Sequence, residues 1–249
     1  MFTELSSILN ATPDRFTQGE FILVSDRQSD ASFLIHHFLS FYLRAHYSAI
    51  SQRLGVSLTQ AREKSQLIFL EGLKESLSIL IPQYCSNWHA SRREREKVPD
   101  VFSIRPFYRA WVEEWGPPVL LVDDVSVLLS LGVSAGAVLD FSHYCRATVC
   151  SQLQGNIVTL VRCHGEEAED DGSDGGSEWL LKGLAHLCSL TLHVQGLPTG
   201  YCRDIHGQVE VCWRRRRGDG QHTQKKLFQY KVHNKGASFF APGTSSAVL

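Results

Sequence analysis

Two adjacent aspartates, Asp123 and Asp124, follow directly after the apolar run Val119–Val122. A short apolar run of this kind is typical of a buried parallel strand. In nucleotide-hydrolysing enzymes, an aspartate at the carboxyl end of such a strand holds a magnesium ion. The pair therefore suggests a magnesium and nucleotide site, and such a site needs a phosphate-binding loop elsewhere in the chain.

The expected place for that loop is the turn after the first strand, because nucleotides bind where a parallel strand passes through a glycine-rich turn into a helix. Here the turn reads SDRQSDAS, residues 25–32. A functional loop needs glycines, a lysine and a hydroxyl group. Only the hydroxyl, on Ser32, is present, and Asp26 and Asp30 add negative charge that repels a polyphosphate. The phosphate loop is degenerate, so we expect no cofactor, no metal and no catalytic residue.

Asp123 and Asp124 then have two interpretations. In the first, one of them binds magnesium or activates a water molecule. In the second, which we favour because the lysine is missing, the pair ends a strand and caps the helix that follows. Arg27 has the right charge to replace the lysine, but it lies in the turn rather than at the start of the helix.

The elements that must position these residues follow from the apolar pattern. Apolar runs predict buried strands, and apolar residues at helical spacing predict helices. The predicted strands are residues 21–24, 67–70, 119–122, 157–161 and 190–194, and the predicted helices are residues 31–44, 73–81, 134–152 and 179–187. Further along, a period of two predicts a hairpin of residues 201–205 and 208–213, with more antiparallel strands over residues 227–232 and 237–240.

Strands and helices that alternate, followed by antiparallel strands, predict an α/β fold over residues 1–249 as a single domain. Its sheet is expected to be mostly parallel, with helices on both faces and an antiparallel extension at one edge. Two segments differ from this pattern. Residues 83–116 are charged and aperiodic and then rich in aromatic side chains, and residues 164–178 are acidic and glycine-rich and are predicted to form a mobile loop.

The composition limits the class of protein. A chain of 249 residues with 43% hydrophobic content suits a globular protein, and a formal net charge of -1 provides no global field that attracts nucleic acid. The seven cysteines have no zinc-finger or C-x-x-C spacing, so reduced thiols of the cytosol or nucleus are expected. No segment predicts a membrane span, and the amino terminus does not read as a secretory signal.

Several long segments are distinctive: TPDR (residues 12–15), SFLIHHFLSFYLRA (32–45), LGVSLTQAREKSQLIFLEGLK (54–74), PVLLVDDVSVLLSLG (118–132), AVLDFSHYCRATVC (137–150), GYCRDIHGQ (200–208) and SFFAPGTSSAVL (238–249). In this order the sequence resembles the family of the sixth subunit of the Elongator complex. The likeness covers most of the chain. Residues 82–117 do not resemble the family, and residues 44–53 are shorter than the family's counterpart, which contains a hydrophobic strand.

The resemblance implies a RecA-like, three-layer fold of the P-loop NTPase type without a functional nucleotide site. It also implies assembly with the fourth and fifth Elongator subunits, two copies of each, into a hexameric ring that joins the catalytic Elongator subunits. That complex modifies the wobble uridine of tRNA, and the ring is implicated in tRNA binding and release. The expected location is the cytoplasm and the nucleus. The alternatives are an active P-loop ATPase and a stand-alone RNA-binding module.

A basic cluster is predicted at the tip of a hairpin near the carboxyl terminus. It consists of Arg214, Arg215, Arg216, Arg217, Lys225 and Lys226, on either side of a glycine-containing turn. Cations at such a tip can neutralise the phosphates of tRNA, and these six residues are the candidate tRNA contacts. A solvated loop without a partner is the alternative, and the sequence does not choose between the two.

Overall fold

The apolar runs of the sequence form the strands of one mixed sheet in the computed structural model. The structure describes residues 8–9, 18–27, 29–47, 61, 63, 67, 117–163, 175–198, 200, 202–217, 220–233 and 236–243. Within this part of the chain there are seven paired strands, and the sheet order is β2-β3-β1-β4-β5-β6-β7. The strands are β1 (Phe21–Arg27), β2 (Val119–Val122), β3 (Asn156–Cys163), β4 (Leu190–Gln195), β5 (Gly207–Arg217), β6 (Gly220–His233) and β7 (Gly236–Phe240).

The first four strands are parallel, and the last three continue the sheet as an antiparallel extension. β1 is central to the parallel part, because it pairs with β3 on one side and with β4 on the other. β2 adds to the outer side of β3. On the opposite side β5 pairs antiparallel with β4, and β6 and β7 follow by antiparallel pairing. The carboxyl ends of the parallel strands therefore lie at one edge of the sheet, where the predicted site belongs.

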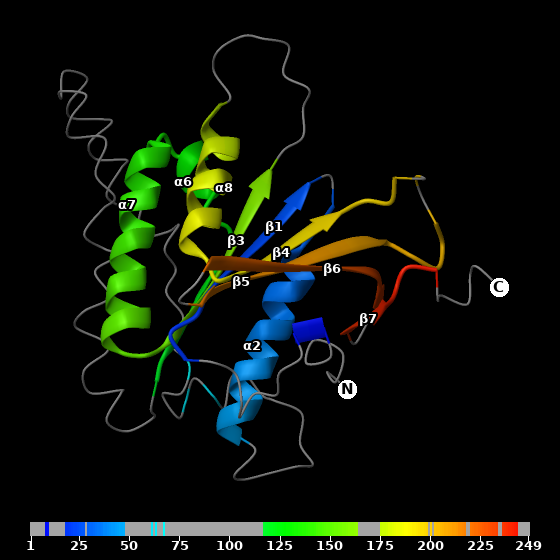
Figure 1. Ribbon diagram of the computed structural model, residues 1–249, viewed down its shortest axis with the longest axis horizontal. Helices are drawn as coiled ribbons and strands as arrows, with labels where there is room; N and C mark the ends of the chain where they lie inside the picture. The colour runs from blue at the N-terminus through cyan, green and yellow to red at the C-terminus, as the bar shows by residue number, and fades with distance from the viewer. Residues whose placement is uncertain are drawn as a thin grey trace.

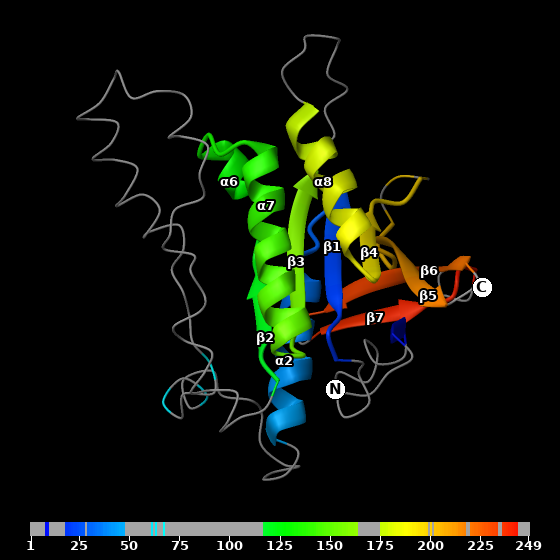
Figure 2. The same cartoon turned by 60° about the vertical axis from the view of Figure 1, so that its left-hand side comes forward.

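Helices cover the sheet on both faces (Figures 1 and 2). The described helices are α2 (Ser32–Tyr47), α6 (Val127–Ser130), α7 (Ala135–Cys145), the π-helix η3 (Arg146–Gln152) and α8 (Gly175–Leu187). α7 and α8 lie side by side on one face, and α2 lies on the other. Successive parallel strands must be joined by crossovers, and these crossovers carry the helices onto the two faces.

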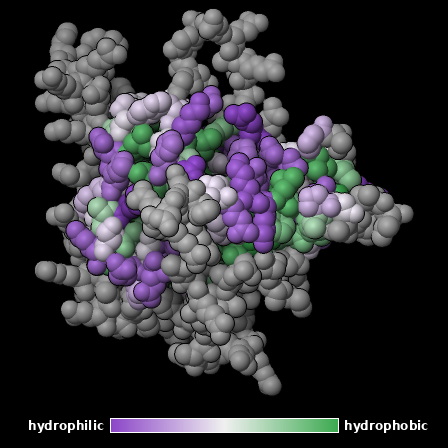
Figure 3. All heavy atoms as spheres, in the orientation of Figure 1, coloured by the Kyte–Doolittle hydropathy of each residue, from purple (hydrophilic) through white to green (hydrophobic). Residues whose placement is uncertain are grey.

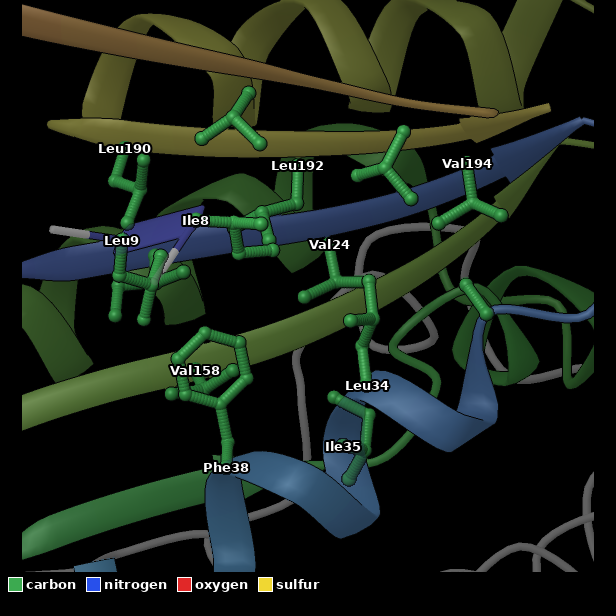
Figure 4. Packing of buried hydrophobic residues seen from close by; sticks show 14 of the residues in the cluster. Ile8, Leu9, Val24, Leu34, Ile35, Phe38, Val158, Leu190, Leu192 and Val194 are labelled. Carbon is green, nitrogen blue, oxygen red and sulfur yellow. The ribbon is translucent and has the colours of Figure 1, made fainter. Parts of the chain in front are cut away.

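Two hydrophobic clusters hold the three layers together. The first joins α2 to the sheet, and Figure 4 shows Leu34 and Phe38 of α2 packed beneath Val24, Val158 and the leucines of β4. Phe38 and Leu34 have no exposed surface. The second cluster joins α7, η3 and α8 to the opposite face. Adjacent residues of β1 point to opposite faces, so residues 21–24 are all apolar and each cluster takes alternate residues of this run.

The predicted architecture is confirmed. The sheet is parallel in its first part, has helices on both faces and is extended by antiparallel strands at one side, as expected for the RecA-like, three-layer α/β class. β2 has the predicted bounds, and β3, β4, β7 and α2 differ from the predicted segments by at most a few residues at either end. The ends of strands are harder to predict from a sequence than the strands themselves, because a strand end depends on hydrogen bonds to neighbouring strands.

The helix expected over residues 134–152 is present within one residue of those bounds, as α7 and the π-helix η3 in direct succession. Two other boundary predictions are wrong. Ser25, Asp26 and Arg27 were expected in a loop but belong to β1, because neighbouring strands on both sides supply hydrogen-bond partners beyond the apolar run. Residues 175–178 were assigned to the acidic loop but form the first turn of α8, where packing of the helix on its neighbours outweighs the weak helix propensity of glycine.

The predicted hairpin of residues 201–205 and 208–213 is also wrong. Residues 202–206 form no strand, and β5 pairs instead with β4 and with β6. In the segment before β5, the backbone N–H of His206 donates to the carbonyl of Tyr230 at 2.8 Å. A period of two identifies a strand but not its partner, and the sheet order decided the partner here.

Several predictions lie outside the described residues. These are the strand beginning at Leu67, of which only that residue is described, the helix over residues 73–81, the divergent segment 83–116, and residues 164–174 of the acidic loop. In the described part of the chain, no helix is long and apolar enough to span a membrane.

Candidate functional site

The carboxyl end of β1 holds the residues where a phosphate loop was sought. Asp26 is in the strand and only 3% exposed, so it is buried beneath the start of α2 rather than displayed in a turn. Its carboxylate Oδ2 accepts a hydrogen bond from the backbone N–H of Ala31 at 3.1 Å. Free N–H groups at the start of a helix are the groups that bind phosphate in nucleotide sites. Here the chain's own carboxylate is bound to one of them.

Burial raises the pKa of Asp26 above its ordinary value. The hydrogen bond from Ala31 and the charge of Arg162 oppose this shift, and the nearby carboxylates of Asp124 and Asp30 add to it. A second negative group, such as a phosphate, would meet this buried carboxylate at short range. The negative charge that the sequence analysis expected to repel a polyphosphate therefore belongs in part to the buried carboxylate of Asp26.

Asp30 caps α2 from the exposed side. Its Oδ1 accepts a hydrogen bond from the backbone N–H of Ser32 at 2.9 Å. This bond is the main reason that the pKa of Asp30 lies below its ordinary value, and the charge of Arg162 lowers it further. Aspartate is a favoured residue at this position because its side chain satisfies an N–H that the helix leaves unpaired.

Arg162 of β3 is the residue that the sequence did not reveal. Its register partner in the sheet is Asp26, and its guanidinium extends to the residues around the start of α2. Nη2 donates to Ser32 Oγ at 2.6 Å and lies 3.5 Å from Asp30 Oδ1. The hydroxyl that a phosphate loop would offer to magnesium is therefore bound to an arginine of the same chain.

The same arginine reaches the end of β2. Its Nε lies 3.3 Å from Asp124 Oδ2, as an ion pair without the alignment of a hydrogen bond. The backbone N–H of Arg162 also donates to Ser126 Oγ at 3.1 Å. One guanidinium thus connects the residues that follow β1 with those that follow β2, two parts of the chain that are remote in sequence.

Asp124 binds Ser126, the N-cap residue of α6, and is not itself the cap that the sequence predicted. Asp124 adopts a left-handed backbone conformation with φ of 63°. Its Oδ1 accepts hydrogen bonds from both the backbone N–H, at 3.1 Å, and the hydroxyl of Ser126. This arrangement closes the turn that leads into α6. Asp123 is exposed, so only one member of the pair takes part in the network around Arg162.

The site combines three carboxylates, from Asp26, Asp30 and Asp124, with the guanidinium of Arg162. Each carboxylate also accepts a hydrogen bond from a backbone N–H of this chain. In the described residues, no group of three histidine, cysteine, aspartate or glutamate side chains is arranged to hold a metal ion. The turn after β1 contains no lysine, and two N–H groups at the start of α2, those of Ala31 and Ser32, are bound to aspartates of the chain.

Comparison with known proteins places this geometry in a family. A sequence model described as Elongation complex protein 6 matches residues 2–234. The chain belongs to this family. It is 58% identical to Elongator complex protein 6 of Danio rerio and 47% identical to that of Homo sapiens, and each alignment covers 100% of both chains. A solved KaiC-like protein from Pyrococcus horikoshii covers 91% of each chain at 9% identity with a TM-score of 0.46, and this likeness adds nothing to the assignment.

In this member of the Elongation complex protein 6 family, the candidate tRNA contacts lie on β5 and β6. Arg214, Arg215, Arg216 and Arg217 end β5, and Lys225 and Lys226 lie on the antiparallel partner strand β6. The six residues thus share one hairpin, but the two lysines lie away from its tip, opposite Cys212 and Val211. The backbone of all four arginines is described, and Arg214 is the only one whose side chain is described.

The three of these cations whose side chains the structure describes each contact a group of the same chain. Arg214 donates from Nη1 to the carbonyl of Ala185 in the last turn of α8, where positive charge stabilises a helix. Lys225 forms an ion pair with Glu210 at 2.9 Å. Lys226 lies over the ring of Trp213, 5.7 Å from its centroid, and is exposed. The six residues could not be distinguished from the sequence, whereas the structure shows that Arg214, Lys225 and Lys226 have different partners.

The cysteines of this family member that the structure describes are free thiols, and most are buried. Burial raises the pKa of Cys145 to about 12 and the pKa of Cys150 to about 11. A thiolate is the reactive form, so these two residues are unreactive near neutral pH. His193 is hydrogen-bonded through Nδ1 to Ser25 Oγ at 2.9 Å, and burial lowers the pKa of His193, as expected for a neutral structural histidine.

Proposed function

We propose that this chain is a non-catalytic subunit of the Elongator complex whose nucleotide site is closed by its own side chains. The observation that carries this proposal is the hydrogen bond between Asp26 and the N–H of Ala31, with Arg162 bound to Ser32 beside it. An acceptor already occupies the start of α2, and an internal cation already satisfies the hydroxyl. Family membership supplies the complex to which such a subunit belongs.

The finer part of the proposal concerns partners. The chain assembles with the fourth and fifth Elongator subunits, two copies of each, into a hexameric ring in the cytoplasm and nucleus. The ring joins the catalytic Elongator subunits and supports modification of the wobble uridine of tRNA by binding and releasing the tRNA. A full-length match to proteins named for this complex supports the assignment.

Equilibrium binding of a fluorescent ATP analogue, with magnesium, tests the closed site. The purified full-length chain is expected to show no saturable binding in the micromolar range, because nothing compensates for the negative charge of the phosphates. Binding that is lost in Asp124→Ala but not in Asp123→Ala would overturn the proposal in favour of the active ATPase. Asp123 is a suitable control because it is exposed and lies outside the network around Arg162.

Native mass spectrometry after co-expression with the other two ring subunits tests the assembly. The expected mass is that of two copies of each of the three chains. A chain that stays monomeric in their presence, yet binds tRNA alone with the affinity of the mixture, would instead support the stand-alone RNA-binding module.

A further inference from the structure

The hairpin of β5 and β6 extends beyond both of its neighbours in the sheet. Pairing with β4 ends at Trp213, and pairing with β7 begins only at Gln229. Residues 214–217 therefore pair with residues 220–223 and with no other described strand. We call residues 214–217 and 220–226 the basic ribbon; its residues 224–226 pair with residues 211–213, where β5 still lies beside β4. A two-stranded ribbon that carries cations beyond the body of a sheet is a shape that nucleic acids accept.

The base of the basic ribbon is fixed to the rest of the molecule. On β5, the backbone N–H of Arg214 donates to the carbonyl of Ser189 at 2.7 Å, and its side chain binds the end of α8. On β6, Lys225 is paired with Glu210. These two cations hold the ribbon in place and are partly neutralised. Lys226 is exposed, and the sequence places three further arginines directly after Arg214 on the same strand.

Trp213 limits the kind of contact that the ribbon can make. One part of this side chain packs against the hydrophobic cluster between α2 and the sheet, and the ammonium group of Lys226 lies over its ring. A base cannot stack on a ring that is covered in this way. The cation–π contact also holds the lysine in place, which reduces the entropy lost when it binds a phosphate.

The surroundings favour a polyanion over a protein partner. Residues 223–226 are exposed and polar, and Leu227 is the exposed apolar residue next to them. The side of the molecule seen in Figure 3 has a band of hydrophilic residues near its centre and only small hydrophobic patches. A peptide partner would need an apolar pocket for an anchor residue, whereas phosphate contact needs only cations. Since the net charge of the chain is -1, the attraction is local to the ribbon.

We propose that the basic ribbon binds the phosphate backbone of RNA without reading its sequence, with Lys226 and Arg215, Arg216 and Arg217 as the contacting residues and with Arg214 and Lys225 as supports. This inference rests on the proposed function, which supplies tRNA as the ligand. It goes further by naming the surface, by dividing the six cations into two roles, and by requiring an affinity that depends on salt and not on sequence.

Fluorescence anisotropy with labelled tRNA tests the proposal, using the complex with the other two ring subunits and, in parallel, the full-length chain alone. The ribbon variant is Arg215→Gln with Arg216→Gln and Arg217→Gln. The matched control is Lys182→Gln with Arg203→Gln and Lys231→Gln, which removes the same charge from cations that lie outside the basic ribbon. Lys226→Gln is measured as a single variant. Titrations are made from 50 to 300 mM salt and repeated with an unrelated RNA of equal length.

The ribbon variant is expected to weaken tRNA binding by about 10- to 100-fold near 0.1 M salt and to reduce the slope of log Kd against log salt by about two to three. Lys226→Gln should reduce the slope by about one, and the control should stay within about twofold of the wild type. Both RNAs should be affected equally. Circular dichroism of each variant checks that the fold is kept, and the single variant keeps the test decisive if the triple variant does not fold.

Several results would overturn this inference. One is wild-type RNA affinity in both the ribbon variant and Lys226→Gln, and another is equal loss in the control. A third is competition by polyglutamate at the concentration at which RNA competes, which would identify an acidic protein as the partner. Loss of assembly in the wild type would overturn the proposed function instead, and the titrations of the chain alone would still decide the role of the ribbon.

Discussion

The carboxylate of Asp26 accepts a hydrogen bond from the backbone N–H of Ala31, with 3.1 Å between Oδ2 and N, at the start of α2. It ties the buried end of the central strand to the first turn of the helix that covers it. The bond therefore has a structural consequence that is independent of any ligand, and mutation can measure it.

Replacing Asp26 should distinguish its role as an acceptor from its charge. Asp26→Ala leaves the buried N–H of Ala31 without a partner and should lower the free energy of unfolding by about 1–3 kcal/mol. Asp26→Asn keeps an acceptor oxygen and should stay within about 1 kcal/mol of the wild type. Urea denaturation measures both. Asp123→Asn, on the exposed neighbour of Asp124, is the control and should change stability by less than about 0.5 kcal/mol. Equal losses in the two Asp26 variants would contradict the assigned role.

Arg162 should contribute more to stability than an ordinary surface ion pair. Arg162→Ala removes the bond to Ser32 and leaves Asp30 and Asp124 without their shared cation, so the free energy of unfolding should fall by about 1–2 kcal/mol. Arg162→Lys should recover only part of this loss, because an ammonium group cannot reach in several directions as a guanidinium does.

The control for Arg162 is Lys182→Ala, which breaks an exposed i,i+4 pair with Glu178 on α8. Its cost should be about 0.3–0.5 kcal/mol. Both proteins are compared by urea denaturation at the same ionic strength. If the two alanine variants lose the same amount, the network around Arg162 is no more than a surface ion pair.

Stability should depend on pH in opposite directions at Asp26 and Asp30. The pKa of Asp26 is raised in the folded protein, so its ionisation opposes folding, and Asp26→Asn should become more stable relative to the wild type as pH rises from below 4 through the folded pKa. The pKa of Asp30 is lowered, so the wild type should gain stability relative to Asp30→Asn above about pH 4, the ordinary aspartate pKa, and lose it as pH falls through the lower folded value.

Urea midpoints between pH 3 and pH 7 measure both differences, with Asp123→Asn as the reference. The sign of the change is the test, because each difference rises or falls with pH according to the direction of the pKa shift. A relative stability of Asp26→Asn that falls with rising pH would show that the hydrogen bond from Ala31 outweighs burial.

The contact between α7 and α8 should not tolerate a methyl group at Gly183. A Cβ atom there would lie 2.6 Å from Cδ1 and 2.8 Å from Cδ2 of Leu139 on α7. Gly183→Ala should therefore lower the free energy of unfolding by about 1–3 kcal/mol, although alanine is the better helix former. Gly176→Ala in the same helix meets no atom within 4 Å and should be neutral or stabilising by up to about 1 kcal/mol. Thermal denaturation measures both variants. Equal stabilisation of the two would contradict close packing of Gly183 against Leu139.

The site was partly predictable from the sequence. The aspartates were identified because they stand beside apolar runs, and their charge alone argued against a nucleotide. Arg162 was missed because nothing around it in the sequence marks it: it is the seventh residue of an apolar strand, where an arginine reads as a solvated strand end. Its being the register partner of Asp26 is the one signal that could have found it, and register is a property of the sheet.

The basic ribbon shows the same division. The sequence determined that six cations would share one hairpin, because local alternation and a turn suffice for that. It did not determine that Arg214 caps α8, since that contact requires α8 to end beside β5.

By itself, then, the sequence determined the α/β class, the order of most elements and the absence of a phosphate loop, because each depends on neighbouring residues in the chain. The tertiary structure alone decided which side chains meet at the carboxyl end of β1. Arg162 meets Ser32 and Asp30 across separations of 130 and 132 residues. Contacts of that kind arise only when the sheet order sets strands from distant parts of the chain next to one another, and no local pattern encodes that order.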